Sequence, residues 1–184
     1  METLQYAARI LDDLREIVTA VDAAKTRTVL ADVREANRVF IAGAGRSLLM
    51  MRAFAMRLMH LGMSVYVVGE TVTPAIGKDD LLLIGTASGE TATLKVVAEK
   101  AKKAGAKLDV LTIYENSSIG KMADRVLVIP AATNQVEDGK TSWQPGGSSF
   151  EQSLLILLDG MVADLAQKMG VPLSGALSRH ANLE

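Results

Sequence analysis

Five short apolar segments alternate with helical segments through the middle of the sequence, and this alternation constrains the fold more than any other feature. The apolar segments are rich in Val, Leu and Ile and lie at residues 38–42, 64–68, 80–85, 107–112 and 125–129. Helices are expected between and after them, at residues 46–61, 91–104, 118–123 and 148–169. Apolar strands that alternate with helices indicate a parallel sheet covered on both faces. Short right-handed crossovers then favour a three-layer, doubly wound α/β fold, with a five-stranded parallel sheet in a flavodoxin-like order.

A different pattern precedes the first strand. Apolar residues recur at steps of three and four from Leu4 through Leu11, which predicts a long helix and then a shorter one around residues 25–36. This N-terminal helical hairpin has no strand of its own, so we expect it to pack on the edge of the domain or on another subunit. The length of 184 residues suits a single domain. Its expected parts are the helices at 1–36, an α/β core at 37–172 and a polar C-terminal tail at 173–184.

Composition excludes several classes of protein. Hydrophobic residues make up 49% of the chain, which argues against disorder, and the net charge of −1 argues against electrostatic binding of nucleic acid or membranes. The sequence has no cysteine, so disulfides, a thiolate nucleophile and cysteine-bound metals are excluded. Neither a signal peptide nor an apolar run of membrane-spanning length is found, so we expect a cytoplasmic protein.

The first motif is Gly-Ala-Gly-Arg-Ser at 43–47, between the first strand and the first core helix. Its small residues allow a sharp turn and the close approach of a ligand, and the helix N-terminus offers free N–H groups to an anion. A tight strand–helix turn without any ligand explains the motif equally well. A nicotinamide-type nucleotide site is a third alternative, with Glu70 as the ribose-binding acid. However, Leu48 stands where that fingerprint requires a third glycine.

The second motif is Thr-Ala-Ser-Gly-Glu-Thr at 86–91, between the third strand and the next helix. The hydroxyl groups of Thr86, Ser88 and Thr91 can donate to phosphate oxygens, and backbone N–H groups of the turn can add more donors. An elaborate helix cap, with Ser88 or Thr91 as the capping residue, fits the same spacing. Ligands of doubly wound sheets bind beyond the carboxyl ends of the strands, where both motifs are expected to lie.

Together the two motifs resemble the sugar isomerase (SIS) family, because Gly-Ala-Gly-Arg-Ser and Ser-Gly-Glu-Thr follow alternate strands. Four further segments resemble the family of 6-phospho-3-hexuloisomerases, and they lie at 54–60, 116–121, 147–152 and 180–184. The resemblance covers nearly the whole chain. Its most specific parts are the Phe-Glu-Gln run and the terminal His-Ala-Asn-Leu-Glu run, which generic SIS domains lack.

The resemblance implies an isomerase that converts D-arabino-hex-3-ulose 6-phosphate to D-fructose 6-phosphate, the second step of the ribulose monophosphate route of formaldehyde fixation. It also implies a homotetramer built as a pair of dimers, with active sites near subunit boundaries. The reaction moves protons through an enediol(ate) and requires no redox cofactor and no obligatory metal. One departure from the family pattern is Ala87, where some relatives have Gly or another small or polar residue.

The resemblance also suggests catalytic groups. Glu151 is expected to be the base, although on its own it fits a first-turn acid at a helix N-terminus. His180 is expected to act as proton shuttle or ring-opening acid from a neighbouring subunit, although a tail residue of this kind is otherwise simply exposed. His60, at the end of the first core helix, is a third catalytic candidate, beside a structural role at the negative helix end.

Arg46 is expected to support the phosphate or the enediolate charge, and Ser47 to contact phosphate or a sugar oxygen. Glu90 is expected to orient Arg46 or bind sugar hydroxyls, or to be a plain first-turn acid. The complete set of expected substrate-binding residues is Gly45, Arg46, Ser47, Thr86, Ala87, Ser88, Gly89, Glu90 and Thr91. Alternatives to this function are a different phosphosugar aldose–ketose isomerase and a non-catalytic phosphosugar-binding regulator.

Overall fold

The computed structural model describes residues 2–133, 142–172 and 179–183. Eleven helices and strands occur within these ranges; after the first two helices, strands alternate with helical elements except that β3 follows β2 directly. They are α1 (Thr3–Thr19), α2 (Ala23–Glu35), β1 (Val39–Gly43), α3 (Gly45–His60), β2 (Val65–Val67), β3 (Leu81–Gly85), α4 (Ala92–Lys103), β4 (Lys107–Thr112), the 3₁₀ turn η1 (Gly120–Met122), β5 (Arg125–Val128) and α5 (Ser148–Lys168).

The five strands form one parallel sheet in the order β2-β1-β3-β4-β5. This is the flavodoxin-like order, so the predicted doubly wound α/β fold is confirmed. From β1 the chain moves outward to β2, and it then returns across β1 to continue through β3, β4 and β5. The direction of winding therefore reverses between β1 and β3.

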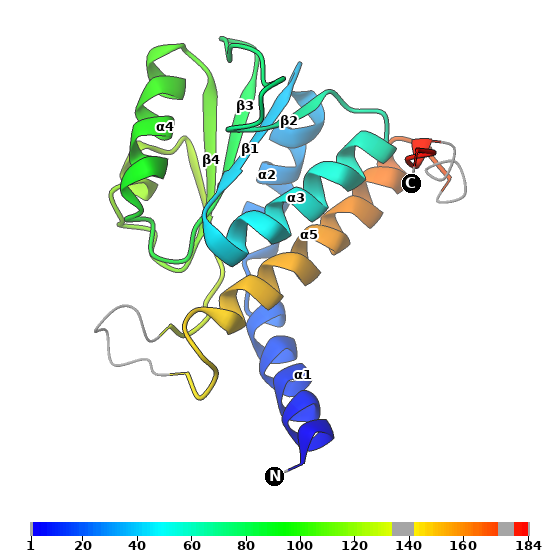
Figure 1. The fold of residues 1–184 in the computed structure, drawn as a ribbon, viewed down its shortest axis with the longest axis vertical. Coiled ribbons are helices and arrows are strands. Elements are labelled where there is room, and N and C mark those ends of the chain that lie inside the picture. Colours follow the sequence, from blue (N-terminus) through cyan, green and yellow to red (C-terminus); the bar gives the residue numbers. More distant parts are fainter. Residues whose placement is uncertain (1, 134–141, 173–178, 184) are drawn as a thin grey trace.

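Helices cover both faces of the sheet and give it three layers (Figure 1). Because side chains alternate along a strand, Ile41 and Leu83 face α2, α3 and α5, while Phe40 and Leu82 face α4. Both sets are fully or almost fully buried. The sheet is thus apolar on its two faces, as the uninterrupted hydrophobic runs predict.

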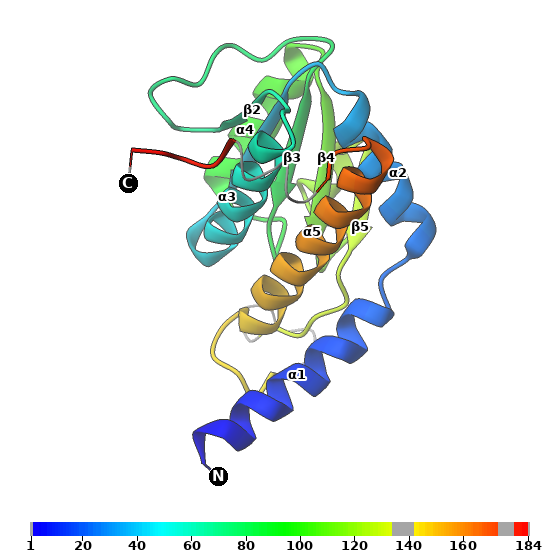
Figure 2. The ribbon, with the colours of Figure 1, turned by 90° about the vertical axis from the view of Figure 1, so that its right-hand side faces the viewer.

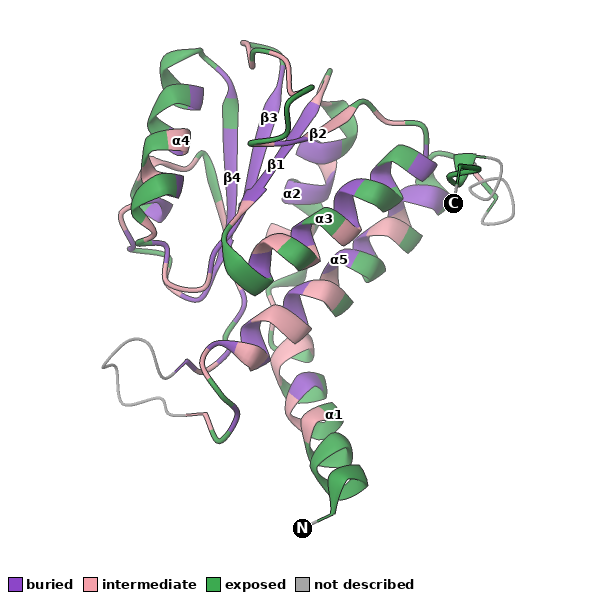
Figure 3. Ribbon diagram, in the orientation of Figure 1, coloured by how far each residue is buried: buried purple, intermediate pink, exposed green. Residues whose placement is uncertain are grey.

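The N-terminal helices differ from the expected hairpin. α2 packs on the edge strand β5, whereas α1 continues away from the domain and contacts mainly α5 (Figure 2). The far half of α1 is exposed (Figure 3), with Leu4 and Leu11 among its exposed apolar residues. None of the helices in the described ranges is long and apolar enough to span a membrane.

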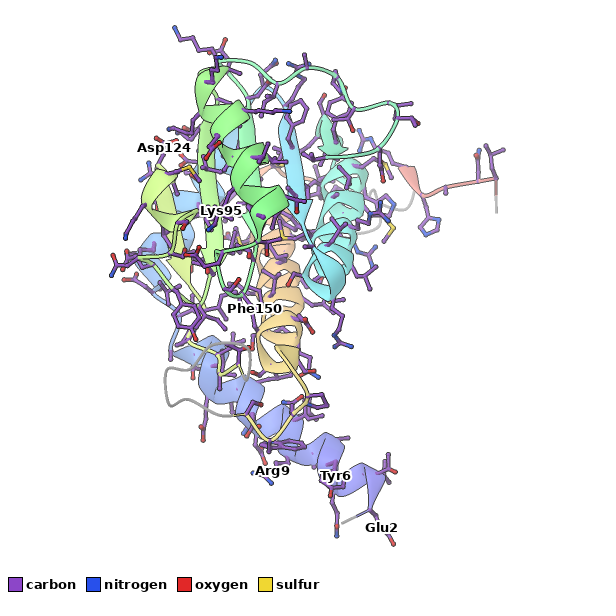
Figure 4. The ribbon with its side chains drawn as sticks, turned by 60° about the vertical axis from the view of Figure 1, so that its left-hand side comes forward. Glu2, Tyr6, Arg9, Lys95, Asp124 and Phe150 are labelled. Atoms are coloured by element: carbon purple, nitrogen blue, oxygen red, sulfur yellow. The ribbon has the colours of Figure 1, made fainter. Side chains whose placement is uncertain are left out.

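An aromatic contact ties α1 to the rest of the chain. The Trp143 ring stacks on Tyr6 with 5.8 Å between centroids, and the Arg9 guanidinium lies 4.5 Å above the Trp143 ring. The Trp143 indole N–H also donates to the Asp13 carboxylate at 2.7 Å. Figure 4 shows Tyr6 and Arg9 on the projecting part of α1. Trp143 therefore holds α1 of its own chain.

A group of charged side chains around the buried Asp32 carboxylate fastens α2 to the sheet. The Asp32 carboxylate of α2 accepts hydrogen bonds from Lys107 Nζ at 2.9 Å and from Arg125 Nε. Beneath it lies Asp109 of β4, which is fully buried and whose two carboxylate oxygens have no hydrogen-bond partner. Burial first, and then the neighbouring Asp32 carboxylate, raise the pKa of Asp109 to about 8. Asp109 is therefore a neutral acid in the folded protein at pH 7.

This buried acid predicts a pH dependence of stability. In the unfolded chain Asp109 ionises near its ordinary pKa, so the free energy of unfolding falls as pH rises from about 4 to about 8. We expect Asp109→Asn, whose amide can donate to Asp32, to raise the free energy of unfolding at pH 8 by about 2 kcal/mol. Urea unfolding at pH 5 and pH 8 checks this, with the exposed Asp159→Asn as control. An unchanged pH slope in Asp109→Asn would contradict it.

Candidate functional site

The two motifs meet where the sheet reverses its winding. β1 pairs with β3 in register, with Gly43 opposite Gly85, so the segments that follow the two strands leave the sheet side by side. Ligands of open α/β sheets bind at such a point, beyond the carboxyl ends of the strands. A Cβ atom at Gly85 would lie 2.6 Å from the Met51 sulfur, so a side chain here would displace the Met51 side chain of α3.

A cavity of about 380 Å³ opens at this point. It draws its walls from the start of α3, from the segment after β3 and from the start of α5. The lining residues are Ala44, Gly45, Arg46, Ser47, Gly85, Thr86, Ala87, Ser88, Thr91, Gly147 and Glu151. Most of the substrate-binding residues expected from the sequence line it, and so does the expected base Glu151.

Three helix N-termini converge on this cavity without side-chain caps. The N-cap residues of α3, α4 and α5 are Ala44, Thr91 and Gly147, and none of them makes a capping hydrogen bond with its side chain. By contrast, Asp22 caps α2 with two hydrogen bonds to its carboxylate. The first N–H groups of a helix carry a partial positive charge and need acceptors. Helix ends of this kind are chemically suited to an anion such as phosphate.

The hydroxyl groups of the second motif are arranged as donors. Thr86 Oγ1 accepts from the Gly89 N–H and Ser88 Oγ accepts from the Glu90 N–H, both at 3.2 Å, so each hydroxyl keeps its own proton to donate. The Thr91 hydroxyl makes no capping bond. The loop N–H groups of Gly89 and Glu90, in contrast, are engaged within the loop. The available donors are therefore mainly hydroxyls and helix ends.

Ser47 adds a further hydroxyl from α3. Its side chain is buried, lines the cavity, and forms no hydrogen bond with the described part of the chain. Because Ser47 lines the cavity, its hydroxyl is placed to donate to a ligand oxygen. No cluster of three His, Asp or Glu side chains that could hold a metal occurs in the described ranges.

One ion pair lies in the cavity. Arg46 Nε donates to a carboxylate oxygen of Glu151, whose side chain is 13% exposed, while that of Arg46 is 59% exposed. Glu151 lies in the first turn of α5, and Arg46 is close to the start of α3. The site therefore combines uncapped helix ends and hydroxyl groups with one carboxylate and one half-exposed guanidinium.

Glu90 does not orient Arg46, because Arg46 pairs with Glu151 instead. The Glu90 carboxylate accepts from the N–H and the hydroxyl of Ser118, each at 2.7 Å, and pairs with Lys95 at 2.5 Å. The hydrogen bond from Lys95, followed by those from Ser118, lowers the pKa of Glu90 to about 2. Neither Gly89 nor Glu90 lines the cavity.

Both histidines lie away from this cavity within one chain. His60 ends α3, and the helical rise separates it from Arg46 by about 21 Å. Its buried ring stacks on His180 with 5.3 Å between centroids, and Arg179 reaches the His60 carbonyl at 3.4 Å. Burial, then Arg57 and His180, lower the pKa of His60. Figures 1 and 2 both place the C-terminal segment at the end of α3 that is remote from β1.

The sequence analysis missed Gly147 as a member of the site. The Gly-Gly pair before the last predicted helix could have indicated Gly147. A glycine at the N-cap has no side chain to cap the helix, so it leaves the helix end open. Ser118, which donates to the Glu90 carboxylate from a segment distant in the chain, could not be matched with Glu90 from its local sequence.

Comparison with known proteins identifies relatives of this chain. The SIS domain family model matches residues 32–150. A 3-hexulose-6-phosphate isomerase of Bacillus subtilis is 39% identical, over the whole of both chains. A protein of the same name from Mycobacterium gastri is 39% identical and covers 95% of this chain and 88% of its own. A hypothetical protein of Methanococcus jannaschii, whose crystal structure infers a function of 3-hexulose-6-phosphate isomerase, is 32% identical with a TM-score of 0.84 and full coverage of both chains.

The loop geometry predicts a large difference between two glycine substitutions. Gly89 has φ +66° and a Cβ there would lie 2.0 Å from Ser117 Oγ, whereas Gly170 has φ +65° and open space around it. We expect Gly170→Ala to lower the free energy of unfolding by about 1 kcal/mol, because of its backbone conformation alone. Gly89→Ala should lower it by about 3 kcal/mol or more, because the new side chain also meets Ser117. Urea unfolding of both variants measures this. Equal costs would show that Ser117 does not constrain the loop.

Proposed function

This chain belongs to the SIS domain family, and we propose that it converts D-arabino-hex-3-ulose 6-phosphate to D-fructose 6-phosphate, the second step of the ribulose monophosphate route of formaldehyde fixation. The observation that carries the proposal is one cavity that joins an anion cradle to the Arg46–Glu151 pair. The names of relatives that are 39% identical over most or all of their length support the choice of substrate.

The cradle would bind the substrate's phosphate. Helix N-termini and the hydroxyls of Ser47, Thr86, Ser88 and Thr91 supply donors without a lysine in the cavity lining. Anchoring the phosphate fixes the sugar carbons relative to Glu151, which lies across the cavity on α5. In this proposal the hydroxyls and helix ends hold the phosphate, and the Glu151 side chain transfers the proton.

Glu151 would act as the base. It takes the proton from C2 of the hexulose, whose C3 carbonyl becomes an enediolate oxygen and then a hydroxyl. The C2 hydroxyl loses its proton as the C2 carbonyl forms, and C3 receives a proton on carbon. Arg46 lies beside Glu151, and its guanidinium would stabilise the negative charge that develops on the enediolate oxygens.

A second group must move protons between the two oxygens, and we assign this to His180 of a neighbouring subunit. Within one chain His180 lies at the far end of α3 from Glu151. This separation is the reason for proposing that it acts on another chain's cavity. The active unit would be a homo-oligomer, which we propose to be a tetramer with sites near the subunit boundaries. The His60 ring stacks on His180 at 5.3 Å, so it would lie beside His180 at the neighbour's cavity, and we keep it as the third catalytic candidate.

A phosphorylated sugar is retained inside cells by its charge, so we also propose a cytoplasmic location. The alternatives are a different phosphosugar isomerase and a non-catalytic phosphosugar-binding regulator. No feature of the site favours either over the hexulose 6-phosphate isomerase, and the relatives that match along most or all of the chain bear the name of the latter.

The assay for this function is direct. Hexulose 6-phosphate is generated from ribulose 5-phosphate and formaldehyde by a separate synthase, and fructose 6-phosphate formation is followed. We expect product formation that depends on the purified protein and needs no added metal or nicotinamide cofactor. Absence of fructose 6-phosphate would rule out the proposed activity, and formation from arabinose 5-phosphate or another phosphosugar alone would favour the first alternative.

The role of Glu151 predicts a clean loss of turnover. We expect Glu151→Gln to lower kcat by about 10³-fold, because the amide cannot accept the C2 proton. Binding of fructose 6-phosphate should change by less than about threefold, since the phosphate cradle is intact. Asp159→Asn, an exposed acid on the same helix, serves as the matched control. A kcat near the wild-type value would remove Glu151 as the base.

The assignment of His180 predicts complementation between two inactive variants. In hetero-oligomers of Glu151→Gln and His180→Ala subunits, some sites join an intact Glu151 to an intact His180 from the neighbour. If equal amounts of the two variant subunits pair at random, about one site in four contains both an intact Glu151 and an intact His180. Activity is measured after subunit exchange, with mixed oligomers verified by native mass spectrometry. If verified mixed oligomers recover no activity, His180 does not act between subunits.

A further inference from the structure

The loop 86–91 is held from outside the cavity by the segment 115–120. The Ser118 N–H and hydroxyl donate to the two Glu90 carboxylate oxygens, each at 2.7 Å. The Ile119 N–H donates to the Gly89 carbonyl at 3.1 Å. The loop follows β3, whereas Ser118 and Ile119 follow the neighbouring strand β4. These bonds therefore fix the loop to a different part of the domain. We call Glu90, Lys95 and Ser118 the Glu90 clasp.

Lys95 completes the clasp from the first turn of α4 (Figure 4). Its ammonium group lies 2.5 Å from the Glu90 carboxylate. The hydrogen bond from Lys95, and then those from Ser118, hold the pKa of Glu90 at about 2, so the carboxylate is ionised at any pH at which the protein works. An ionised carboxylate makes stronger hydrogen bonds to Ser118 than a neutral group would.

The direction of the Glu90 side chain matters for an anion site. Glu90 stands between Ser88 and Thr91, which both line the cavity, yet Glu90 does not line it. A carboxylate turned into the cavity would repel a phosphate dianion. In the Glu90 clasp, the Glu90 carboxylate points toward Ser118, and the ammonium group of Lys95 balances its negative charge.

The backbone of the loop has little freedom beside this segment. Gly89 is in the left-handed region, and Ser117 occupies the space where any side chain at this position would lie. On the other side, Thr112 Oγ1 and the Ile113 N–H donate to the Ala87 carbonyl, both at 3.1 Å. The loop backbone is therefore held on both sides, and the hydroxyls of Thr86 and Ser88 are held by bonds within the loop.

We propose that Glu90 is a positioning residue: through Ser118 and Lys95 it holds the 86–91 loop in the conformation that binds phosphate, without contacting the substrate. The identity of the substrate rests on the proposed function, but the effect on phosphate binding does not. A loop that is already ordered loses less conformational entropy when the ligand binds.

Binding measurements test this directly. Inorganic phosphate and fructose 6-phosphate are titrated by calorimetry into the wild-type protein, Glu90→Ala and the control Glu115→Ala. Glu115 lies in the segment 115–120, but within the described ranges its carboxylate pairs with Lys25, at 2.7 Å, and not with the loop, so its removal changes the charge equally without affecting the loop. We expect about tenfold weaker binding in Glu90→Ala and less than about twofold change in the control. With hexulose 6-phosphate, KM should rise about tenfold while kcat stays within about twofold.

Glu90→Gln separates position from charge. Its amide oxygen still accepts from the Ser118 N–H, so we expect most of the affinity to return, to within about threefold of the wild type. If the charge of Glu90 alone mattered, Glu90→Ala and Glu90→Gln would behave alike. Ser118→Ala should weaken binding less than Glu90→Ala does, and it should have little further effect in the Glu90→Ala background.

Three results would overturn the proposal. One is a Glu90→Ala variant that binds both ligands as tightly as, or more tightly than, the wild type. Another is equal weakening by Glu115→Ala. The third is a wild-type protein that binds neither ligand. A wild-type protein that binds phosphate but does not turn over hexulose 6-phosphate would reject the proposed function, while the binding series would still decide the role of Glu90.

Discussion

The close approach of α3 to the carboxyl ends of β1 and β3 determines the geometry of the site. Gly43 and Gly85 face each other in the sheet, and a Cβ atom at either would approach α3 too closely: 3.0 Å from the Leu48 backbone at Gly43 and 2.6 Å from the Met51 sulfur at Gly85. Because neither position has a side chain, α3 starts directly above the sheet. Its first turn then brings Arg46 and Ser47 into the cavity.

The same constraint decides which groups surround the cavity. Three helices begin around it, and none of their N-cap side chains makes a capping bond, although the Ser148 N–H at the start of α5 donates to the Pro145 carbonyl at 3.3 Å. Lys95, the lysine of the motif region, does not line the cavity and pairs with Glu90. The guanidinium of Arg46 pairs with the carboxylate of Glu151, so in the proposed function charge stabilisation and phosphate binding fall to different groups.

Much of the fold was predictable, because the strands are mainly apolar and the crossover rule admits few orders for such a chain. The meeting of both loops at one cavity was predictable for the same reason, since parallel strands bring their carboxyl ends together. The partners within the site were not. Arg46 meets Glu151, and Glu90 meets Ser118, through contacts that depend on the backbone path between them. Local spacing also does not reveal the direction of α1, which depends on α5 and on the stack with Trp143.

The placement of His180 at the end of α3 opposite the cavity has a consequence for symmetry. Two chains related by a two-fold axis, with their α3 helices antiparallel, would each present a C-terminal segment to the other's cavity. Such an exchange is reciprocal, so catalytic centres would be completed two at a time and none in a lone chain. Turnover per chain would then obey mass action and decline on dilution below the dissociation constant of the pair, even though every chain remained folded.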